Sequence, residues 1–464
     1  MKVSDITSLT LTQTIAALDE KKFSEEELNN AYLERIKKLD PKLNAFLEIN
    51  EKSNKIPAAI KSLISTRGLK TSSASKIIEN YNPPFNATVI GRLLDKGVSV
   101  IGKTNQDEFA MGSSGENSAF GSTKNPWDLI KVPGGSSSGS VAAVAADLAV
   151  FALGTDTGGS IRQPASLCGV VGFKPSYGRV SRYGAISMAS SLDQIGPIGK
   201  SVEDVRLILE WIQGPDGFDS NCQPSSHLRG ATRVAADAHL GGGLNGVKVG
   251  VPKEYFAVPA GRQGEGLDSG VEKVVKDAIK EMEELGAEIV EISLPNTQYA
   301  VAVYYIIMAS EVSSNLARFD GIRFGGDRSL FGAEPKRRIM LGTFALSTGY
   351  YDDYYNKAAK VRTLIKKDFE KAFEKCDVIV GPVSPTVAWK LGEKISDPLT
   401  MYLSDVYTIP ASLAGIPGLS VPAGFSEGMP VGVQILGKYM DEETILNVGE
   451  VLEKALDIKE KPKL

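Results

Sequence analysis

Two clusters rich in glycine and serine carry the side chains that could do covalent chemistry in this sequence. The first spans residues 133–140 and includes Ser136, and the second spans residues 154–160 and ends on Ser160. A serine hydroxyl can attack a carbonyl carbon once a base removes its proton, and glycine leaves backbone N–H groups free to bind the oxyanion that forms. These residue types therefore indicate an enzyme that transfers or hydrolyses acyl groups.

Histidine is too scarce to supply the base in the usual way. The two histidines, His227 and His239, both lie in a polar, Gly-rich stretch between residues 224 and 245. A Ser-His-Asp triad is therefore not expected, and another residue type must act as general base. The three cysteines, Cys168, Cys222 and Cys376, are scattered and match neither a disulfide framework nor zinc-ligand spacing. We expect no metal site in this chain.

Other interpretations of these motifs lack the context they need. Residues 97–104 match the phosphate-binding pattern GxxxxGK[ST], but the four middle residues are an apolar, β-forming run. Residues 135–139 match GxSxG without a convincing strand before them, and residues 73–76 match SxxK without its partner motifs. The clusters could also be linkers or turns, although their apolar flanks are not typical of a solvated linker.

Length, charge and hydropathy place the chain among folded enzymes. It has 464 residues, a formal charge of −4 and a pI near 5.6. This charge provides no basic surface for nucleic acid, so any RNA would be held by another chain. No uncharged apolar run reaches the roughly 18 residues of a membrane span, and the first residues do not resemble a secretory signal. We expect a cytoplasmic protein without membrane contact.

Apolar periodicity predicts an α/β fold, with one mixed sheet sandwiched between helices. Ser24 and Glu27 form a capping box for a helix within residues 5–40. Further helices are expected from about 84 to 96, 140 to 149 and 271 to 285, and strands at 98–101, 247–251, 288–294, 377–380, 419–421 and 431–435. The polar segment 214–268 is expected to be a surface excursion.

The two clusters also carry a resemblance to a known family. Gly134-Gly135-Ser136-Ser137, followed by residues 156–162 with the sequence DTGGSIR, resembles the amidase signature family. This resemblance implies Ser160 as nucleophile, Ser136 as a bridging serine held by a cis peptide, and Lys61 as base. Ser160 lies 24 residues after Ser136, which lies 75 after Lys61, and both offsets match the family pattern.

A lysine base must be neutral, although an unperturbed lysine has a pKa of about 10.4. Burial would have to lower the pKa of Lys61 by about 3, at a cost of roughly 4 kcal/mol. The apolar run before it, residues 57–60, could provide that burial. The oxyanion of the reaction is then expected to bind the backbone N–H groups of the second cluster, namely those of Thr157, Gly158, Gly159 and Ser160.

Within this family, residues 105–114, 174–193, 313–321 and 336–344 resemble the glutaminase subunits of tRNA-dependent amidotransferases. The resemblance implies that glutamine is the substrate, with Arg338 facing its α-carboxylate, Asp405 its α-amino group and Tyr304 forming a pocket wall. It also implies that this chain binds no cofactor. ATP, magnesium and tRNA would be bound by a partner, within a complex that contains B and C subunits. The ammonia released would amidate Glu-tRNA(Gln) or Asp-tRNA(Asn) there.

The resemblance extends over most of the chain and predicts a single domain. Its expected parts are N-terminal helices at about 5–45, a signature core at about 55–212, the excursion at 214–268 and the rest of the sandwich at about 269–455. Two departures stand out: Ser62-Leu63 replaces the usual Asp-Asn after the lysine, and the segment between Arg323 and Lys336 is short. They leave two alternatives open, a stand-alone amidase for small amides and a catalytically silent scaffold subunit.

Overall fold

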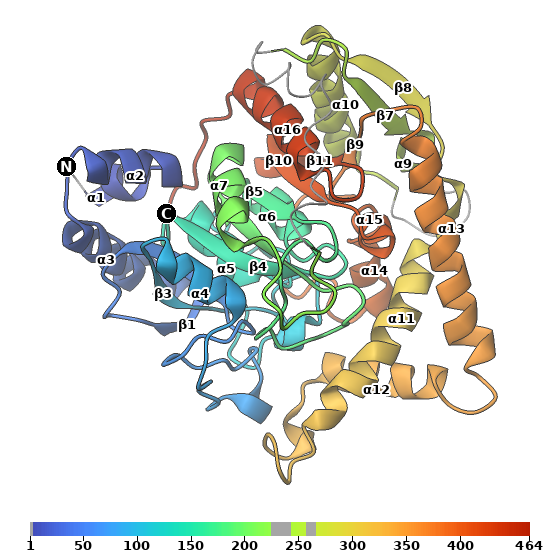
Figure 1. The fold of residues 1–464 in the computed structure, drawn as a ribbon, viewed down its shortest axis with the longest axis horizontal. Coiled ribbons are helices and arrows are strands. Elements are labelled where there is room, and N and C mark those ends of the chain that lie inside the picture. The colour runs from blue at the N-terminus through green and yellow to red at the C-terminus, as the bar shows by residue number, and fades with distance from the viewer. Residues whose placement is uncertain (1–2, 224–242, 257–265) are drawn as a thin grey trace.

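One mixed β-sheet of eleven strands organises the computed structural model, which describes residues 3–223, 243–256 and 266–464 (Figure 1). The strand order is β1-β3-β2-β4-β6-β5-β10-β11-β9-β7-β8. The strands are β1 (Phe46–Ile49), β2 (Ile56–Lys61), β3 (Val98–Thr104), β4 (Phe151–Asp156), β5 (Val171–Lys174), β6 (Gln194–Gly199), β7 (Lys248–Pro252), β8 (Glu288–Ile292), β9 (Val378–Pro382), β10 (Gly418–Ser426) and β11 (Met429–Leu436). Strand β2 pairs in parallel with β3 and β4, so the carboxyl ends of these three strands meet at one edge.

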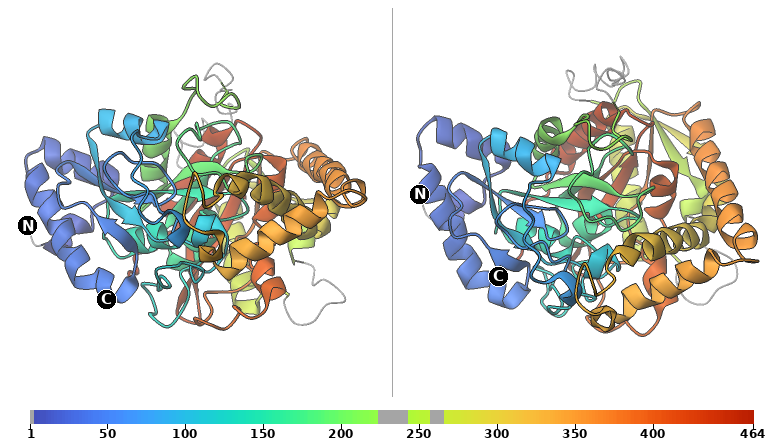
Figure 2. Two further views of the ribbon diagram at one scale, coloured as in Figure 1. Left: turned by 90° about the horizontal axis from the view of Figure 1, so that it is seen from below. Right: turned by 60° about the horizontal axis from the view of Figure 1, so that its bottom comes forward.

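Helices cover both faces of this sheet, as predicted (Figures 1 and 2). On β10, Leu419 and Val421 face Gly449 of helix α16, whereas Ser420 lies with Ser166 of helix α6 around Gly432 of β11. Because successive side chains of a strand point to opposite faces, α16 and α6 lie on opposite sides. Helices α4, α7, α16 and α10 contact one another in that order as one layer, and α5 contacts α6 in the other.

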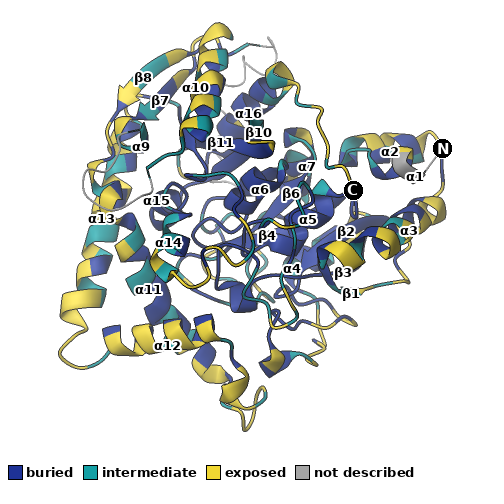
Figure 3. Cartoon of the chain, turned by 180° about the vertical axis from the view of Figure 1, so that it is seen from behind, coloured by how far each residue is buried: buried dark blue, intermediate teal, exposed yellow. Residues whose placement is uncertain are grey.

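The α-helices are α1 (Val3–Thr7), α2 (Leu11–Asp19), α3 (Glu25–Leu43), α4 (Thr88–Asp95), α5 (Ser138–Ala145), α6 (Arg162–Cys168), α7 (Val202–Ile212), α9 (Lys253–Phe256), α10 (Ser269–Glu284), α11 (Ala300–Asn315), α12 (Ala333–Ala345), α13 (Lys357–Ala372), α14 (Pro398–Leu403), α15 (Ile409–Ala414) and α16 (Glu442–Leu456). Helices α11, α12 and α13 lie together at one side of the sheet, and much of their outer surface is exposed (Figure 3). The stretch Pro295–Arg318, which includes α11, is long and apolar enough to cross a membrane by length and composition, but half of the apolar window is buried inside the fold.

Local sequence explains where several elements begin. The predicted capping box precedes α3: the Glu27 N–H donates to Ser24 Oγ at 3.1 Å, and the Ser24 N–H donates to the Glu27 carboxylate at 2.7 Å. A second box, formed by Thr10 and Gln13, precedes α2 and was not predicted. In the segment 97–104, which matches a phosphate-binding pattern, Val98–Thr104 form the buried strand β3. The structure therefore supports its interpretation as a strand.

The predicted helix at 140–149 is wrong in its extent. Helix α5 spans Ser138–Ala145, and Asp147 has a left-handed φ of +56°, which ends it. The chain then enters β4, a strand that was not predicted and whose six residues are all buried. A strand buried on both faces has no alternating pattern, so this apolar sequence could not be distinguished from a helix.

The excursion predicted at 214–268 is only partly described, and the prediction does not hold for Lys248–Pro252, which form β7 within the sheet. Residues 214–223 lie against the body of the protein, where the Asp219 carboxylate accepts from Arg182 Nε at 2.8 Å. His227 and His239 fall outside the described residues, as does most of the remaining excursion.

Candidate active site

Lys61 is the last residue of β2, at the edge where the parallel strands end. Its side chain is fully buried, and its Nζ lies 2.7 Å from Ser136 Oγ and 3.0 Å from Ser137 Oγ. Burial lowers the pKa of Lys61 to about 7, against the opposing effect of nearby carboxylates, of which Asp107 is the largest. A substantial fraction of this amine is therefore neutral near pH 7, which is what a base requires.

The two serines beside Lys61 differ in what else they bind. Ser137 Oγ also donates to the Thr155 carbonyl at 3.2 Å and accepts from the Thr155 N–H at 3.3 Å. Ser136 Oγ has no hydrogen bond besides that with Lys61 within the described ranges of the chain. Its hydroxyl therefore remains available for a proton relay.

The backbone at Ser136 has the cis peptide bond that the resemblance implies, between Gly135 and Ser136. Gly135 cannot be replaced here, because a Cβ on it would lie 2.1 Å from Asp107 Oδ2. Asp107 also donates its N–H to the Ser136 carbonyl at 3.3 Å. Ser136 is thus held at a fixed position in a tightly packed segment.

Ser160 ends the glycine loop that follows β4, and it is 8% exposed. Its carbonyl accepts from the Ser137 N–H at 3.1 Å, so the two clusters are joined through their backbones. No hydrogen bond connects the hydroxyls of Ser136 and Ser160 in the described part of the chain. The structure thus brings the two glycine and serine clusters together, and Lys61 contacts the serines of the first cluster.

A buried ion pair between Asp156 and Arg162 flanks the glycine loop at both of its ends. Arg162 Nε and Nη2 each donate to the Asp156 carboxylate at 2.9 Å, and neither side chain is exposed. Burial alone would raise the pKa of Asp156, but the Arg162 guanidinium more than offsets it and holds that pKa below its usual value. The Arg162 guanidinium also donates to Gln434 Oε1 and Ser412 Oγ, so its buried N–H groups have further hydrogen-bond partners.

We expect Arg162→Met to destabilise the protein by about 3–5 kcal/mol, because it leaves Asp156 buried without its counter-charge. The free energy of unfolding, measured by denaturant titration, checks this. As a control, breaking the exposed pair of Lys273 and Asp277 with Lys273→Met should cost less than about 1 kcal/mol. Equal losses in the two variants would contradict the supporting role of the buried pair.

The residues predicted to bind substrate cover the glycine loop. A Cβ on Gly158 would lie 2.7 Å from the ring of Tyr304, and one on Gly159 would lie 3.0 Å from Asp405 Oδ1. Asp405 Oδ2 accepts from Ser113 Oγ, whereas Oδ1 is buried without a hydrogen-bond partner among the described residues. Burial raises the pKa of Asp405 to about 7. Near pH 7 a large fraction of Asp405 is therefore protonated in this structure, and a cation placed at the unpartnered Oδ1 would favour the ionised form.

Arg338 lies near this group but already has a partner. Its Nε donates to Glu334 Oε1 at 2.8 Å, and its guanidinium carbon lies 5.2 Å from the ring centre of Tyr305 and 5.6 Å from that of Tyr402. The role of Glu334 was not predicted. Its position four residues before Arg338 on a helix could have indicated the ion pair, because side chains at this spacing lie next to each other. The pair keeps this buried cation in place above the aromatic rings.

The decisive comparison is with protein families. A family model described as amidase matches residues 27–446. The chain belongs to the amidase family. It is 52% identical to the A subunit of the glutamyl-tRNA(Gln) amidotransferase of Caldanaerobacter subterraneus subsp. tengcongensis, with 99% of this chain and 98% of that protein covered.

Two solved structures agree with this assignment. The crystal structure of the A subunit of the glutamyl-tRNA(Gln) amidotransferase from Thermotoga maritima is 43% identical, with a TM-score of 0.81 over 98% of this chain and 94% of the other. The peptide amidase of Stenotrophomonas maltophilia is 28% identical, with a TM-score of 0.80 over 98% of each chain. The α/β sandwich is thus the fold of this amidase family member and of its relatives.

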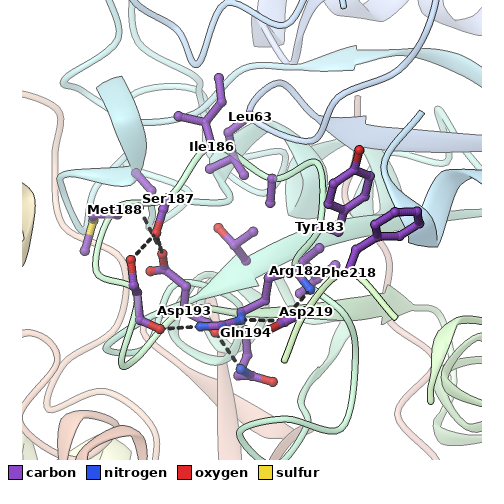
Figure 4. Close-up of a pocket in the computed structure, with 15 residues that line it drawn as sticks. Leu63, Arg182, Tyr183, Ile186, Ser187, Met188, Asp193, Gln194, Phe218 and Asp219 are labelled. Atoms are coloured by element: carbon purple, nitrogen blue, oxygen red, sulfur yellow. Dashed lines mark hydrogen bonds and ion pairs between the residues drawn. The ribbon is translucent and has the colours of Figure 1, made fainter. Parts of the chain in front are cut away.

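A pocket of about 210 Å³ adjoins the glycine loop of this amidase on the side of Thr155 (Figure 4). Its wall includes Asp193, whose carboxylate accepts from Thr157 Oγ1 at 2.7 Å, Ser187 Oγ at 3.0 Å and the Met188 N–H at 2.9 Å. Asp193 therefore ties the loop to the segment that lines the pocket. Its role was not predicted, because the contact with Thr157 joins segments 36 residues apart in the chain.

Proposed function

We propose that this chain is the glutaminase subunit of a tRNA-dependent amidotransferase. It hydrolyses glutamine through an ester on Ser160 and supplies the ammonia to a partner subunit. The observation that carries the proposal is the buried Lys61 amine 2.7 Å from Ser136 Oγ, beside the glycine loop that bears Ser160. The similarity over nearly the full chain to the A subunits of glutamyl-tRNA(Gln) amidotransferases supports the same function.

The proposed chemistry begins with a proton relay. Neutral Lys61 accepts the proton of Ser136, Ser136 accepts the proton of Ser160, and Ser160 Oγ attacks the side-chain amide carbon of glutamine. The C–N bond then breaks, and the leaving nitrogen takes up the proton that Lys61 holds. Ammonia and a glutamyl ester on Ser160 result, and water hydrolyses the ester to glutamate.

Backbone N–H groups would stabilise the tetrahedral oxyanion. We assign this role to the loop formed by Thr157, Gly158, Gly159 and Ser160. A single such donor is typically worth about 3–4 kcal/mol in the transition state. The absence of side chains on the two glycines suits this role, because the loop is closely covered by Tyr304 and Asp405.

A free amino acid differs from other amides by its two charges, and a fixed anion and a fixed cation can recognise them. Asp405 would accept from the α-ammonium through Oδ1, the oxygen that has no partner among the described residues. Arg338 would face the α-carboxylate, while Glu334 and the rings of Tyr305 and Tyr402 hold its guanidinium. Tyr304 would form a wall of the same pocket.

Asp405→Asn is expected to raise the KM for glutamine by about 10- to 100-fold, since it removes a charge-assisted hydrogen bond worth about 1.5–3 kcal/mol. The effect on kcat should be smaller, because Asp405 does not touch the reacting amide. Steady-state glutaminase kinetics measure both constants. Asp397→Asn, at the exposed start of α14, is the matched control. An unchanged KM in Asp405→Asn would remove this residue from the pocket.

The partners follow from the same proposal. B and C subunits would complete the complex, and the partner that binds ATP, magnesium and tRNA would amidate Glu-tRNA(Gln) or Asp-tRNA(Asn). An acidic chain suits a division of labour in which another subunit holds the nucleic acid. We place the complex in the cytoplasm and assign no cofactor to this chain.

A stand-alone amidase is the second candidate, favoured by the likeness to a peptide amidase at 28% identity. Glutaminase activity measured with and without the partner subunits separates the two. The glutaminase activity of a subunit of the complex should change when its partner subunits are added, and glutamine should be its preferred substrate. A stand-alone enzyme should be indifferent to them and hydrolyse other small amides as well.

A further inference from the structure

The side chain of Gln163 lies between the two halves of the site. Gln163 is the second residue of α6 and is fully buried. Its Nε2 donates to the Ser113 carbonyl at 2.9 Å, and its Oε1 accepts from the Gly135 N–H at 3.1 Å. Both ends of the amide are therefore used, and each binds a backbone group from a different segment.

Each of these two segments carries one part of the proposed machinery. Ser113 donates its hydroxyl to Asp405 Oδ2, so the Ser113 segment holds the carboxylate that would bind the substrate ammonium. Gly135 precedes Ser136 directly, so the Gly135 segment holds the relay serine. A continuous path of hydrogen bonds thus runs from Asp405 through Ser113 and Gln163 to Gly135.

The backbone around Gln163 fits this side chain closely. Gly134 has a φ of +81°, and a Cβ on it would lie 2.4 Å from Gln163 Oε1. The Gln163 N–H also donates to the Gly159 carbonyl at 2.8 Å, in the loop of the nucleophile. Gln163 consequently contacts both glycine clusters and has little room to adopt another rotamer.

We propose that Gln163, together with Ser113, is a positioning residue that fixes the ammonium-binding carboxylate relative to the relay serine. The inference rests on the proposed function for the roles of Asp405 and Ser136. Its consequence is that glutamine recognition and proton transfer share one buried scaffold. A shift of about 1 Å in such a group can cost about 100-fold in rate, so a single amide can affect both steps.

The path has two arms: the Asp405 arm runs from Gln163 through Ser113 to Asp405, and the Gly135 arm runs from Gln163 to Gly135. Two variants separate the effects of these arms. Ser113→Ala removes only the hydrogen bond to Asp405, because the Ser113 carbonyl remains available to Gln163. It should raise the KM for glutamine about 10-fold with kcat within about twofold, and Ser113→Thr, which keeps the hydroxyl, should restore the KM. Gln163→Met removes both hydrogen bonds of the Gln163 amide, and with them the connection between the two arms. It should raise the KM about 10- to 100-fold and lower kcat about 10- to 100-fold.

The kinetics are measured on the assembled complex, with Gln213→Met as the control for the same replacement at the end of α7. Glutamine affinity is measured by calorimetry in a Ser160→Ala background, where binding occurs without turnover. A Kd raised by Ser113→Ala and restored by Ser113→Thr supports the Asp405 arm. A Gln163→Met variant with wild-type KM and kcat, or a Ser113→Ala variant with lowered kcat and unchanged KM, would overturn the proposal.

Failure of the proposed function would look different, because the unsubstituted complex would then not hydrolyse glutamine. In that case kcat with a simple aliphatic amide still measures the Gly135 arm. A lowered kcat in Gln163→Met with that substrate, but not in Ser113→Ala, supports the positioning role. Equal kcat values in all three proteins contradict it.

Discussion

Ser160→Ala is expected to lower glutaminase turnover by about 10⁶-fold, the order of loss found when the nucleophile of a serine protease is removed. Without Oγ no ester can form, and the relay from Lys61 through Ser136 has no hydroxyl to deprotonate. Release of glutamate and ammonia from glutamine measures the loss. Binding of glutamine should persist, because Asp405 and the loop glycines are unchanged.

Ser166→Ala is the matched control for this variant. Ser166 lies on α6, six residues after Ser160, and its buried hydroxyl accepts from the Gly432 N–H at 2.8 Å. Its loss should affect stability and leave turnover close to that of the wild type. A Ser160→Ala protein with near-normal turnover would end the assignment of the nucleophile.

Lys61→Arg is expected to lower kcat by about 10²- to 10⁴-fold although it conserves the positive charge. Arginine stays protonated in proteins and cannot accept the proton of Ser136, so general-base catalysis is lost. In the wild type, kcat at saturating glutamine should rise with pH through about 7 and then level off, because only the neutral Lys61 amine accepts a proton. The constant to follow is kcat, because Asp405, whose pKa is also about 7 in the free enzyme, would contribute to kcat/KM. Activity assays across this pH range measure both effects.

Lys103 provides the control for burial itself. It lies on β3 beside β2, is equally buried, and burial lowers its pKa to about 7 as well. Its Nζ donates to the Ile64 carbonyl and to Thr66 Oγ1, away from the serines. Lys103→Met should therefore leave the midpoint of the pH profile unchanged. An active Lys61→Arg enzyme, or a midpoint that moves with Lys103 instead, would refute the role of Lys61 as base.

The parts of the fold that local sequence determines were predictable. The capping box of Ser24 and Glu27 begins α3, and the apolar face of that helix, including Leu28, Tyr32 and Ile36, is buried. Strands β7, β8 and β11 lie within a residue or two of the predicted ranges at one or both ends. Strands β2 and β4 were not recognised; burial along their whole length is not sufficient to explain this, because β3, β9 and β11 are equally buried and were predicted.

The site was predictable only where a motif or a fixed offset marks it. Glycine and serine content drew attention to Ser136 and Ser160, and the offset from the family pattern led to Lys61. In the structure, Lys61 Nζ lies 2.7 Å from Ser136 Oγ. The supporting roles of Asp193, Glu334 and Gln163 were missed, although Asp193 ends one of the stretches that carry the resemblance. The contacts of Asp193 with Thr157 and of Gln163 with Ser113 and Gly135 join segments remote in the chain. Such contacts depend on tertiary packing, which no local pattern encodes.

The central claim is that glutamine is hydrolysed through an ester on Ser160, and mass spectrometry of the acid-quenched enzyme tests it most directly. After brief incubation with glutamine, we predict one glutamyl group on the peptide that contains Ser160, and none in Ser160→Ala. Normal turnover without any adduct, or with the adduct on another residue, would contradict the account.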